Sequence, residues 1–216
     1  MHIPDGFLDV KTWISTAIAS AGALGYSLKK SKGELDEKQV PKLGIMAAFI
    51  FAAQMVNFPI AGGTSGHLLG AALASILLGP WNASIILSTV LVIQCLIFQD
   101  GGITALGGNI FNMAVMGVLT AFITYKGFSG LFKSRVGRNV AIFLASWVSV
   151  FAAATFAAME LALSGTIPFS MAFPTMAGWH ALIGIGEGLI TVVVVNTVTR
   201  MGFADTESRF NEEGEN

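Results

Sequence analysis

Seven apolar segments follow one another along the chain, and they constrain its fold more than any other feature. They cover residues 10–28, 43–58, 67–79, 81–98, 109–125, 139–163 and 177–199. A membrane-spanning helix needs ~20 mostly apolar residues to cross a hydrocarbon core ~30 Å thick, and most of these segments approach or exceed that length. The alternating pattern of a membrane β-barrel is absent. We therefore predict an all-α integral membrane protein, a bundle of about seven transmembrane helices in the lipid bilayer.

The composition agrees with this class. Only 12% of the 216 residues are charged, against about 25% in a typical soluble domain. The segment 67–79 is too short to span, and its length is that of a partly buried or re-entrant helix. We expect residues 1–200 to form a single transmembrane domain and residues 201–216 to form a short charged tail.

Three polar segments between the apolar ones carry nearly all of the basic residues. They are residues 29–42, 126–138 and 200–216, and they hold eleven of the twelve Lys and Arg residues. If seven helices alternate across the membrane, all three segments lie on one side, and their positive charge predicts that this side is cytoplasmic. The N-terminus is then extracytoplasmic and the C-terminus cytoplasmic, in a prokaryotic inner or plasma membrane. The opposite loops, which contain neither Lys nor Arg, are 57–66, 99–108 and 164–176.

The chain begins with Met1-His2, which places three nitrogen donors next to one another. A free α-amine, the His2 backbone nitrogen and the His2 imidazole Nδ1 can close a five-membered and a six-membered chelate ring on one metal ion. This arrangement holds the donors in one plane, which Ni(II) and Cu(II) prefer over Zn(II). The residues before the first apolar segment lack the basic character of a signal peptide. We therefore expect the terminus to be retained, and Met1 with it, because His2 is large.

The other two histidines are predicted on the same side as the N-terminus. His67 follows the glycine-containing loop 57–66, and His180 opens the last apolar segment. Irregular backbone at membrane depth is tolerated where it is buried in protein or lines a cavity. His67 is the candidate for the fourth planar donor, with an ordinary helix residue near the interface as the alternative. His180 is interpreted equally as an interfacial residue or as a partner of a metal-bound imidazole.

Further polar residues border the predicted outer loops. Asn57, Asp100 and Asn109 are candidates for support of the site and its loops. Helix capping is the alternative for Asp100 and Asn109, and we favour it slightly for Asn109. Glu187 lies within the last apolar segment, where an ionisable group is costly and indicates a functional or paired role. Glu160 is close enough to the outer end of its segment to reach the interface, so we assign it no role.

Small residues at four-residue spacing occur in several segments. Gly44, Ala48 and Ala52 form such a stripe in the second segment, and Ala153 and Ala157 form another in the sixth. Small residues at this spacing let helices approach closely. Packing within the chain is the usual interpretation. Contact with a partner subunit is the alternative for the stripe in the second segment.

Sequence motifs of several enzyme classes are absent. The chain has no His-Glu-x-x-His zinc motif, no phosphate-binding loop and no persuasive Ser/His/Asp arrangement. Its basic residues are not interleaved with aromatic ones as in nucleic-acid readers. We therefore predict a binding protein with no catalytic residue, no catalytic cofactor and no nucleic-acid partner. If transport requires energy, another subunit must supply it.

Two motifs give the chain a resemblance to a known family. They are MHIPDGFLD at residues 1–9 and SGHLLG at residues 65–70, accompanied by Gly101-Gly102, Gly107-Gly108-Asn109 and the segment around His180. Together they resemble the substrate-binding membrane subunit of energy-coupling-factor (ECF) transporters for nickel or cobalt. The resemblance covers nearly all of residues 1–200.

The resemblance implies a fold, a ligand set and partners. The fold is a bundle of six common helices with one extra N-terminal helix, and the metal is held by the Met1 amine, the His2 amide and imidazole, and His67. The partners are a membrane coupling subunit, two cytoplasmic ATPases and often a small accessory membrane subunit. The second segment then corresponds to the first common helix of the family, whose Ala-xxx-Ala stripe meets the coupling subunit. Ala48 and Ala52 match that stripe.

We therefore expect a subunit that captures Ni(II) from outside, closes loops 59–66 and 99–108 over it, and releases it inward when the ATPases drive a rearrangement. Pro4-Asp5 resembles the nickel-type start of the family. Co(II), as used in cobalamin synthesis, is the alternative because the same donors can enclose it. A membrane metalloenzyme with three histidines and a passive metal channel are alternatives from other classes.

Overall fold

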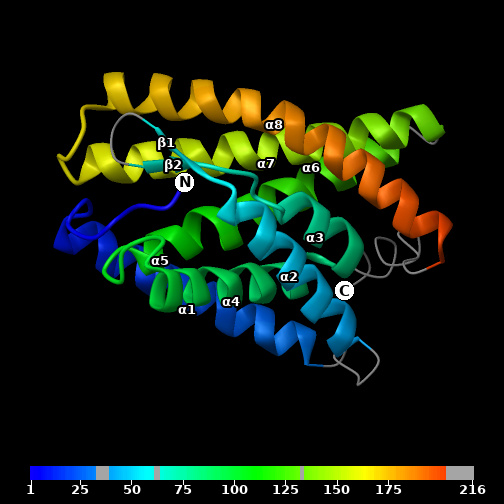
Figure 1. Ribbon diagram of the computed structural model, residues 1–216, viewed down its shortest axis with the longest axis horizontal. Coiled ribbons are helices and arrows are strands. Elements are labelled where there is room, and N and C mark those ends of the chain that lie inside the picture. Colours follow the sequence, from blue (N-terminus) through cyan, green and yellow to red (C-terminus); the bar gives the residue numbers. More distant parts are fainter. Residues whose placement is uncertain (33–38, 61–63, 132–133, 203–216) are drawn as a thin grey trace.

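The computed structural model describes residues 1–32, 39–60, 64–131 and 134–202 (Figure 1). Its elements are α1 (Val10–Ser31), α2 (Val40–Met55), β1 (Phe58–Ile60), β2 (Thr64–Gly66), α3 (Ala71–Leu78), α4 (Pro80–Phe98), α5 (Leu106–Asn109), the π-helix η1 (Ile110–Met116), α6 (Gly117–Leu131), α7 (Arg135–Leu163) and α8 (Phe169–Arg200). The elements α5, η1 and α6 form one continuous helix, Leu106–Leu131. Counted this way, the described ranges hold seven helices, and the predicted all-α membrane bundle is confirmed.

Not every helix is long enough to span a membrane. By length and composition, four helices in the described ranges are suitable, namely α4, the combined helix Leu106–Leu131, α7 and α8. Helix α2 is apolar but has 16 residues, and α3 has only eight. At ~1.5 Å per residue, α3 is ~12 Å long, far short of a ~30 Å hydrocarbon core. As the sequence predicts, segment 67–79 does not span, and its first four residues form irregular backbone.

Helix α3 lies at the centre of the bundle. All eight of its residues are buried, and it contacts α4, α6, α7 and α8. A helix that is apolar on every side is stable only when it is enclosed in this way. It ends at Gly79, whose positive φ of 81° turns the chain directly into α4, and Pro80 occupies the first helical position of α4, where its fixed φ is favourable.

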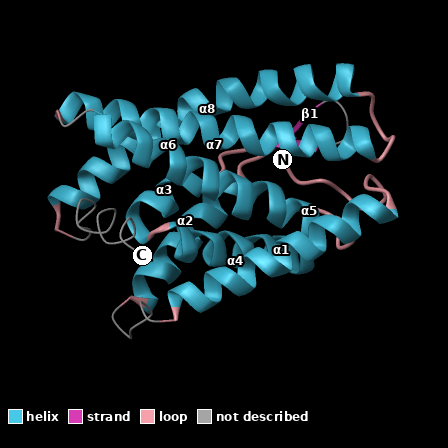
Figure 2. Ribbon diagram, turned by 180° about the vertical axis from the view of Figure 1, so that it is seen from behind, coloured by secondary structure: helices cyan, strands magenta, loops and turns pink. Residues whose placement is uncertain are grey.

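The longer helices lie on either side of this centre. Helix α7 packs against α6 and α8, while α4 contacts α1 and α2 (Figures 1 and 2). Ala153 and Ala157 of α7 are fully buried, so their stripe packs within the chain. The N-terminus lies between the two groups of helices and not on the outside (Figure 1).

The described basic residues lie at one end of the bundle, with Lys11 as the exception. Helices α1, α6 and α8 end there, and α2 and α7 begin there (Figure 1). The alternation of helices predicts this common end. Of the predicted tail 201–216, only Met201 and Gly202 fall within the described residues.

Helix α8 begins eight residues before the predicted boundary at residue 177. Pro168 is its N-cap residue and Pro174 lies inside its second turn. The two prolines and the intervening residues suggested a loop. Because Pro174 is close to the start of the helix, its missing N–H removes only one hydrogen bond to the preceding turn. The loop between α7 and α8 is therefore shorter than expected, spanning residues 164–168.

The small-residue stripe of α2 faces away from the bundle. Gly44, Ala48 and Ala52 are all exposed, and a Cβ atom added at Gly44 would meet nothing within 4 Å. The buried face of α2 is formed by Ile50 and Gln54 instead. The interpretation of this stripe as packing within the chain is therefore wrong.

Candidate metal-binding site

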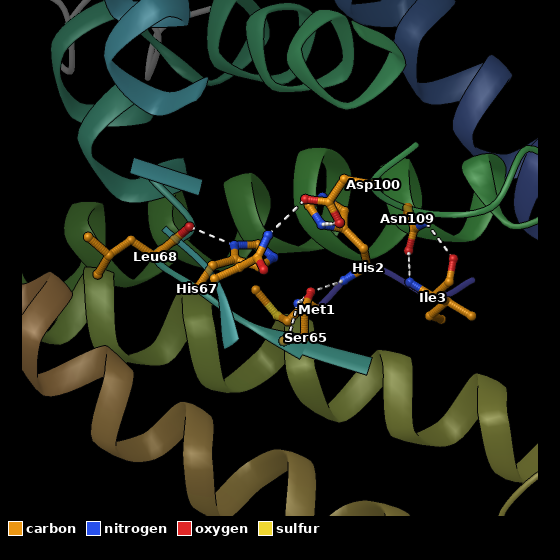
Figure 3. Close-up of polar contacts among 9 residues, drawn as sticks. Met1, His2, Ile3, Ser65, His67, Leu68, Asp100 and Asn109 are labelled. Atoms are coloured by element: carbon orange, nitrogen blue, oxygen red, sulfur yellow. Dashed lines mark hydrogen bonds and ion pairs between the residues drawn. The ribbon is translucent and has the colours of Figure 1, made fainter. Parts of the chain in front are cut away.

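The first three residues lie inside the bundle (Figure 3). Met1 and Ile3 are fully buried and His2 is 4% exposed. The Asn109 side chain holds both backbone groups of Ile3, since Oδ1 accepts from Ile3 N at 2.8 Å and Nδ2 donates to Ile3 O at 3.1 Å. Gly102 N donates to the same carbonyl at 2.9 Å. The buried backbone of Ile3 is therefore fully hydrogen-bonded, as buried peptide groups require.

Asn109 consequently has a different role from the capping that we favoured. It precedes η1, but its side chain makes no capping hydrogen bond. Its amide has an acceptor oxygen and a donor NH2 group side by side, which match the N–H and C=O of Ile3. The structure places it as a clamp on the N-terminal segment.

Glycines make room for that segment. Gly101 has a φ of +95°, and a Cβ atom added at Gly102 would lie 2.2 Å from Asp5 N. Only glycine therefore allows the loop after α4 to approach the N-terminal backbone this closely.

Residues 5–9 fasten the remainder of the segment to two loops. Asp5 Oδ1 accepts hydrogen bonds from Thr104 N at 2.7 Å and Thr104 Oγ1 at 2.6 Å. Thr166 Oγ1 donates to Phe7 O at 2.5 Å. The Asp9 side chain caps α1. The terminus is thus held along its length, which fixes where Met1 and His2 lie.

Ser65, in strand β2, meets both backbone nitrogens of the terminus. The Met1 amine donates to Ser65 O and, at 3.0 Å, to Ser65 Oγ, while His2 N donates to Ser65 Oγ at 3.2 Å (Figure 3). Strand β2 pairs antiparallel with β1. Sequence analysis missed Ser65. The signal was its place within the SGHLLG motif, two residues before His67.

The imidazoles of His2 and His67 stack beside these nitrogens. Their centroids are 4.7 Å apart and their planes 19° from parallel. His67 Nδ1 lies 2.8 Å from Leu68 O, so Nδ1 carries the proton and Nε2 the lone pair. Within the described residues, the buried Nε2 atoms of both rings have no hydrogen-bond partner. The structure thus brings Met1, His2 and His67 together, from positions 1, 2 and 67.

Asp100 and Asn57 form the border of the site. Asp100 Oδ1 lies 3.0 Å from His2 Nδ1, and Asp100 Oδ2 accepts from Asn57 Nδ2 at 3.0 Å. Asp100 is thus in direct contact with a candidate ligand, and Asn57 is one hydrogen bond further away.

Glu187 holds the backbone that follows His67. Its carboxylate in α8 accepts hydrogen bonds from Leu69 N at 2.5 Å and Gly70 N at 2.9 Å, directly before the first residue of α3. Gln54 of α2 donates to Leu69 O at 2.7 Å. A carboxylate is stabilised by exposed N–H groups at a helix N-terminus. Glu187, the buried ionisable group that the sequence analysis singled out, is therefore an anchor for the loop 67–70. Nothing in the sequence indicated that Gln54 would share this role.

His180 is also buried, but it is not one of the two stacked imidazoles. Its Nδ1 lies 2.7 Å from Met176 O, one turn earlier in α8. Met176 Sδ accepts a hydrogen bond from Thr64 of β2 at 2.9 Å. His180 is fully buried, so its interpretation as an interfacial residue is wrong.

Glu160 is a second residue whose position differs from the sequence analysis. It is only 5% exposed and accepts a hydrogen bond from Asn112 Nδ2 at 2.8 Å. Asn112 lies in η1, and π-helical turns often occur near functional sites. Proximity to a helix end suggested an interfacial position, but the neighbouring helix encloses the carboxylate.

Burial favours the neutral forms of the Met1 amine and of both imidazoles. Burial lowers the pKa of the Met1 amine well below its usual value, and Asp100 only partly opposes this. Burial likewise lowers the pKa of His2 and, more strongly, of His67. Burial by itself would raise the pKa of Asp100, but the hydrogen bond and charge of His2 bring it below its usual value. The shifts therefore favour neutral nitrogens beside an ionised Asp100 carboxylate.

These donors are not a conventional cluster of side chains. Within the described ranges, no group of three or more His, Cys, Asp or Glu side chains is placed to hold a metal. The nitrogens gathered here are one α-amine, one backbone nitrogen and two imidazoles. Neutral amine and imidazole nitrogens are ligands for late first-row transition metals.

Comparison with known proteins identifies the family of the chain. A family model described as the cobalt uptake substrate-specific transmembrane region (CbiM) matches residues 2–203. The chain belongs to this family. A relative from Archaeoglobus fulgidus is 44% identical over 200 residues, which are 92% of this chain and 65% of that protein. A fused nickel transport protein of Rhodobacter capsulatus is 37% identical over 215 residues, 93% of this chain and 62% of its own length.

The chain is also similar to a protein of solved structure. A truncated transition metal transporter matches with a TM-score of 0.87 and 36% identity, covering 93% of this chain and 99% of that one. The chain is thus a multi-pass membrane protein of a metal transport family. It spans about two thirds of the length of the two relatives described above.

Proposed function

We propose that this chain is the metal-capture subunit of an energy-coupling-factor importer and that Ni(II) is its cargo. The observation that carries the proposal is the burial of the Met1 amine beside the imidazoles of His2 and His67. A chain terminus is ordinarily exposed and mobile. Here its amine is enclosed beside two imidazoles, and burial lowers the pKa of the amine and of both rings.

Four nitrogens would bind the ion. The Met1 amine, the His2 backbone nitrogen and His2 Nδ1 form the chelate, and His67 Nε2 supplies the fourth donor. Ser65 and Asp100 are the hydrogen-bond partners of the first three. Binding would exchange these hydrogen bonds for metal bonds, and the His2 peptide N–H would release its proton to the solvent. Among the residues that the structure describes, His67 Nε2 has no hydrogen-bond partner.

Nickel is favoured over cobalt because a planar nitrogen set suits Ni(II). The related protein of Rhodobacter capsulatus is named for nickel transport. Co(II) is the second candidate, since the family description names cobalt uptake. A competition titration of the purified chain with both ions separates them, and tighter cobalt binding would reverse the assignment.

The rest of the transport cycle follows from the resemblance. Loops 59–66 and 99–108 close over the ion at the extracytoplasmic side. A membrane coupling subunit, two cytoplasmic ATPases and a small accessory membrane subunit complete the importer, and ATP hydrolysis drives release into the cytoplasm. The basic residues at one end of the bundle support this orientation, because positive charge collects on the cytoplasmic side.

The deciding experiment moves the α-amine. One residue added before Met1 converts the amine into a peptide nitrogen and places a new amine out of reach. We expect calorimetry on the purified chain to show a loss of nickel affinity of at least about a hundredfold, equivalent to about 2.8 kcal/mol. One residue added after Asn216 is the matched control and should leave affinity unchanged. Undiminished affinity in the N-terminal variant would disprove the chelate.

A further inference from the structure

The His2 imidazole is held in the tautomer that cannot chelate. Ring closure with the amine and the backbone nitrogen requires a lone pair on Nδ1. In the structure, Nδ1 faces the Asp100 carboxylate at 3.0 Å, and an ionised carboxylate only accepts hydrogen bonds. The proton is therefore on Nδ1 and the lone pair on Nε2. Metal binding requires the opposite arrangement.

The His67 imidazole, in contrast to that of His2, is already in the tautomer that can bind a metal. Its Nδ1–H is bound by Leu68 O at 2.8 Å, and its unpartnered Nε2 already presents a lone pair. His67 thus needs no change of tautomer, whereas His2 does. Once Nδ1 of His2 is on the metal, its Nε2 carries the proton, and a buried N–H left without an acceptor costs about 1–3 kcal/mol.

Gln94 lies beside the His2 ring. It belongs to the last turns of α4, where its backbone carbonyl accepts a hydrogen bond from Asp100 N at 3.0 Å, so the two residues are next to each other. Its side chain is fully buried and interacts with the His2 imidazole. Among the described residues, neither Nε2 nor Oε1 of the Gln94 amide has a hydrogen-bond partner. Buried polar atoms in this state require an explanation.

Building on the proposed function, we propose that Gln94 is the positioning residue for His2, with its Oε1 accepting the Nε2–H of the metal-bound ring. An amide suits both states of the site. Its Nε2 can donate to the lone pair of the metal-free ring, and after the amide turns over its Oε1 can accept the proton of the metal-bound ring. The imidazole keeps one proton throughout, which moves from Nδ1 to Nε2 as the metal takes the Nδ1 lone pair.

Such partners orient metal-bound imidazoles and raise affinity. In this assignment Asp100 holds the metal-free ring and Gln94 holds the metal-bound ring. His2 is therefore the side chain that changes hydrogen-bond partners when the ion arrives.

Nitrogen NMR of the wild-type chain tests this directly. The protein has three histidines, so ¹⁵N-histidine labelling gives few signals, and planar Ni(II) is diamagnetic. We expect the His2 proton on Nδ1 without metal and on Nε2 with one equivalent of nickel. An Nε2 that stays unprotonated in the nickel-loaded protein would overturn the inference.

Two substitutions of similar size separate the hydrogen bond from packing. Gln94→Met removes the acceptor and should lower nickel affinity by about 10–100-fold, whereas Gln94→Glu keeps an acceptor and should retain affinity within about threefold. Ser88→Ala, on the same helix, is the control, because its hydroxyl donates to Ser84 O within the helix. Equal affinity of the wild type and Gln94→Met, or an equal loss in both Gln94 variants, would overturn the inference. Failure of the wild type to bind nickel would overturn the proposed function as well.

Discussion

Gly102 shows how closely the N-terminal segment fits its surroundings. The space for a Cβ atom at this position is taken by the Asp5 backbone nitrogen, 2.2 Å away. On the same loop, Gly102 N holds Ile3 O. A backbone neighbour cannot rotate away as a side chain can, so any larger residue must displace the segment that carries Met1 and His2.

Gly102→Ala should therefore weaken metal binding while leaving the bundle folded. Overpacking of this kind costs about 1–3 kcal/mol, so we expect nickel affinity in calorimetry to fall about tenfold or more. Gly22→Ala is the matched control, because Gly22 lies in α1 with nothing within 4 Å of an added Cβ. If Gly102→Ala binds nickel as tightly as Gly22→Ala, the close fit has no functional role.

At the scale of elements, each ligand is fixed by contacts from several helices. The backbone after His67 is held by Glu187 from α8 and Gln54 from α2. The backbone after His2 is held by Asn109, at the end of α5. The anchors are buried and the helices that bear them pack in the core, so the donors are positioned before metal arrives.

Helix α2 presents a stripe of small residues outward. Ala48 and Ala52 are exposed although α2 packs on α4. Small residues favour close approach of a second helix. This arrangement supports our proposal that the stripe meets the coupling subunit.

Ala48→Trp should test that surface without disturbing the metal site. We expect unchanged nickel affinity in the isolated chain, but at least about tenfold weaker association with the coupling subunit, equivalent to about 1.4 kcal/mol, because the indole prevents close helix approach. Co-purification and nickel uptake by vesicles measure the two effects. Ala19→Trp, on an exposed position of α1, is the control. Normal assembly of Ala48→Trp would exclude this face.

At the scale of the whole molecule, helix α8 connects the two ends of the bundle. It begins at Phe169, after the loop that holds Phe7, and ends at Arg200 near the other basic residues (Figure 1). The side chains at its two ends therefore report which way the protein faces in the membrane.

Cysteine accessibility in intact cells should reveal this orientation. A membrane-impermeant maleimide should label Ser170→Cys in intact cells, but should label Met201→Cys only after the membrane is opened, because positive charge marks the cytoplasmic side. Both positions are exposed, and the native Cys95 is buried. Labelling of Met201→Cys in intact cells would contradict the proposed topology.

Some features could be predicted because they depend on local composition. The helical bundle, the short central segment and the common end of the basic residues all follow from apolar length and charge, which the membrane selects directly. The helix starts were less predictable, as at Phe169, because proline is tolerated both in the first turns of a helix and in a loop.

That this chain enters a membrane, and that Met1, His2 and His67 are the donors to consider, could be predicted from the residues alone. The burial of the terminus, its clamping by Asn109, the anchoring of the His67 loop by Glu187 and the positions of Gln94 and Asp100 beside His2 depend on the folded arrangement of the helices. Hydropathy and chelate chemistry act between neighbours in the chain, whereas these hydrogen bonds join residues as many as 118 positions apart, and only packing of the helices brings them into contact.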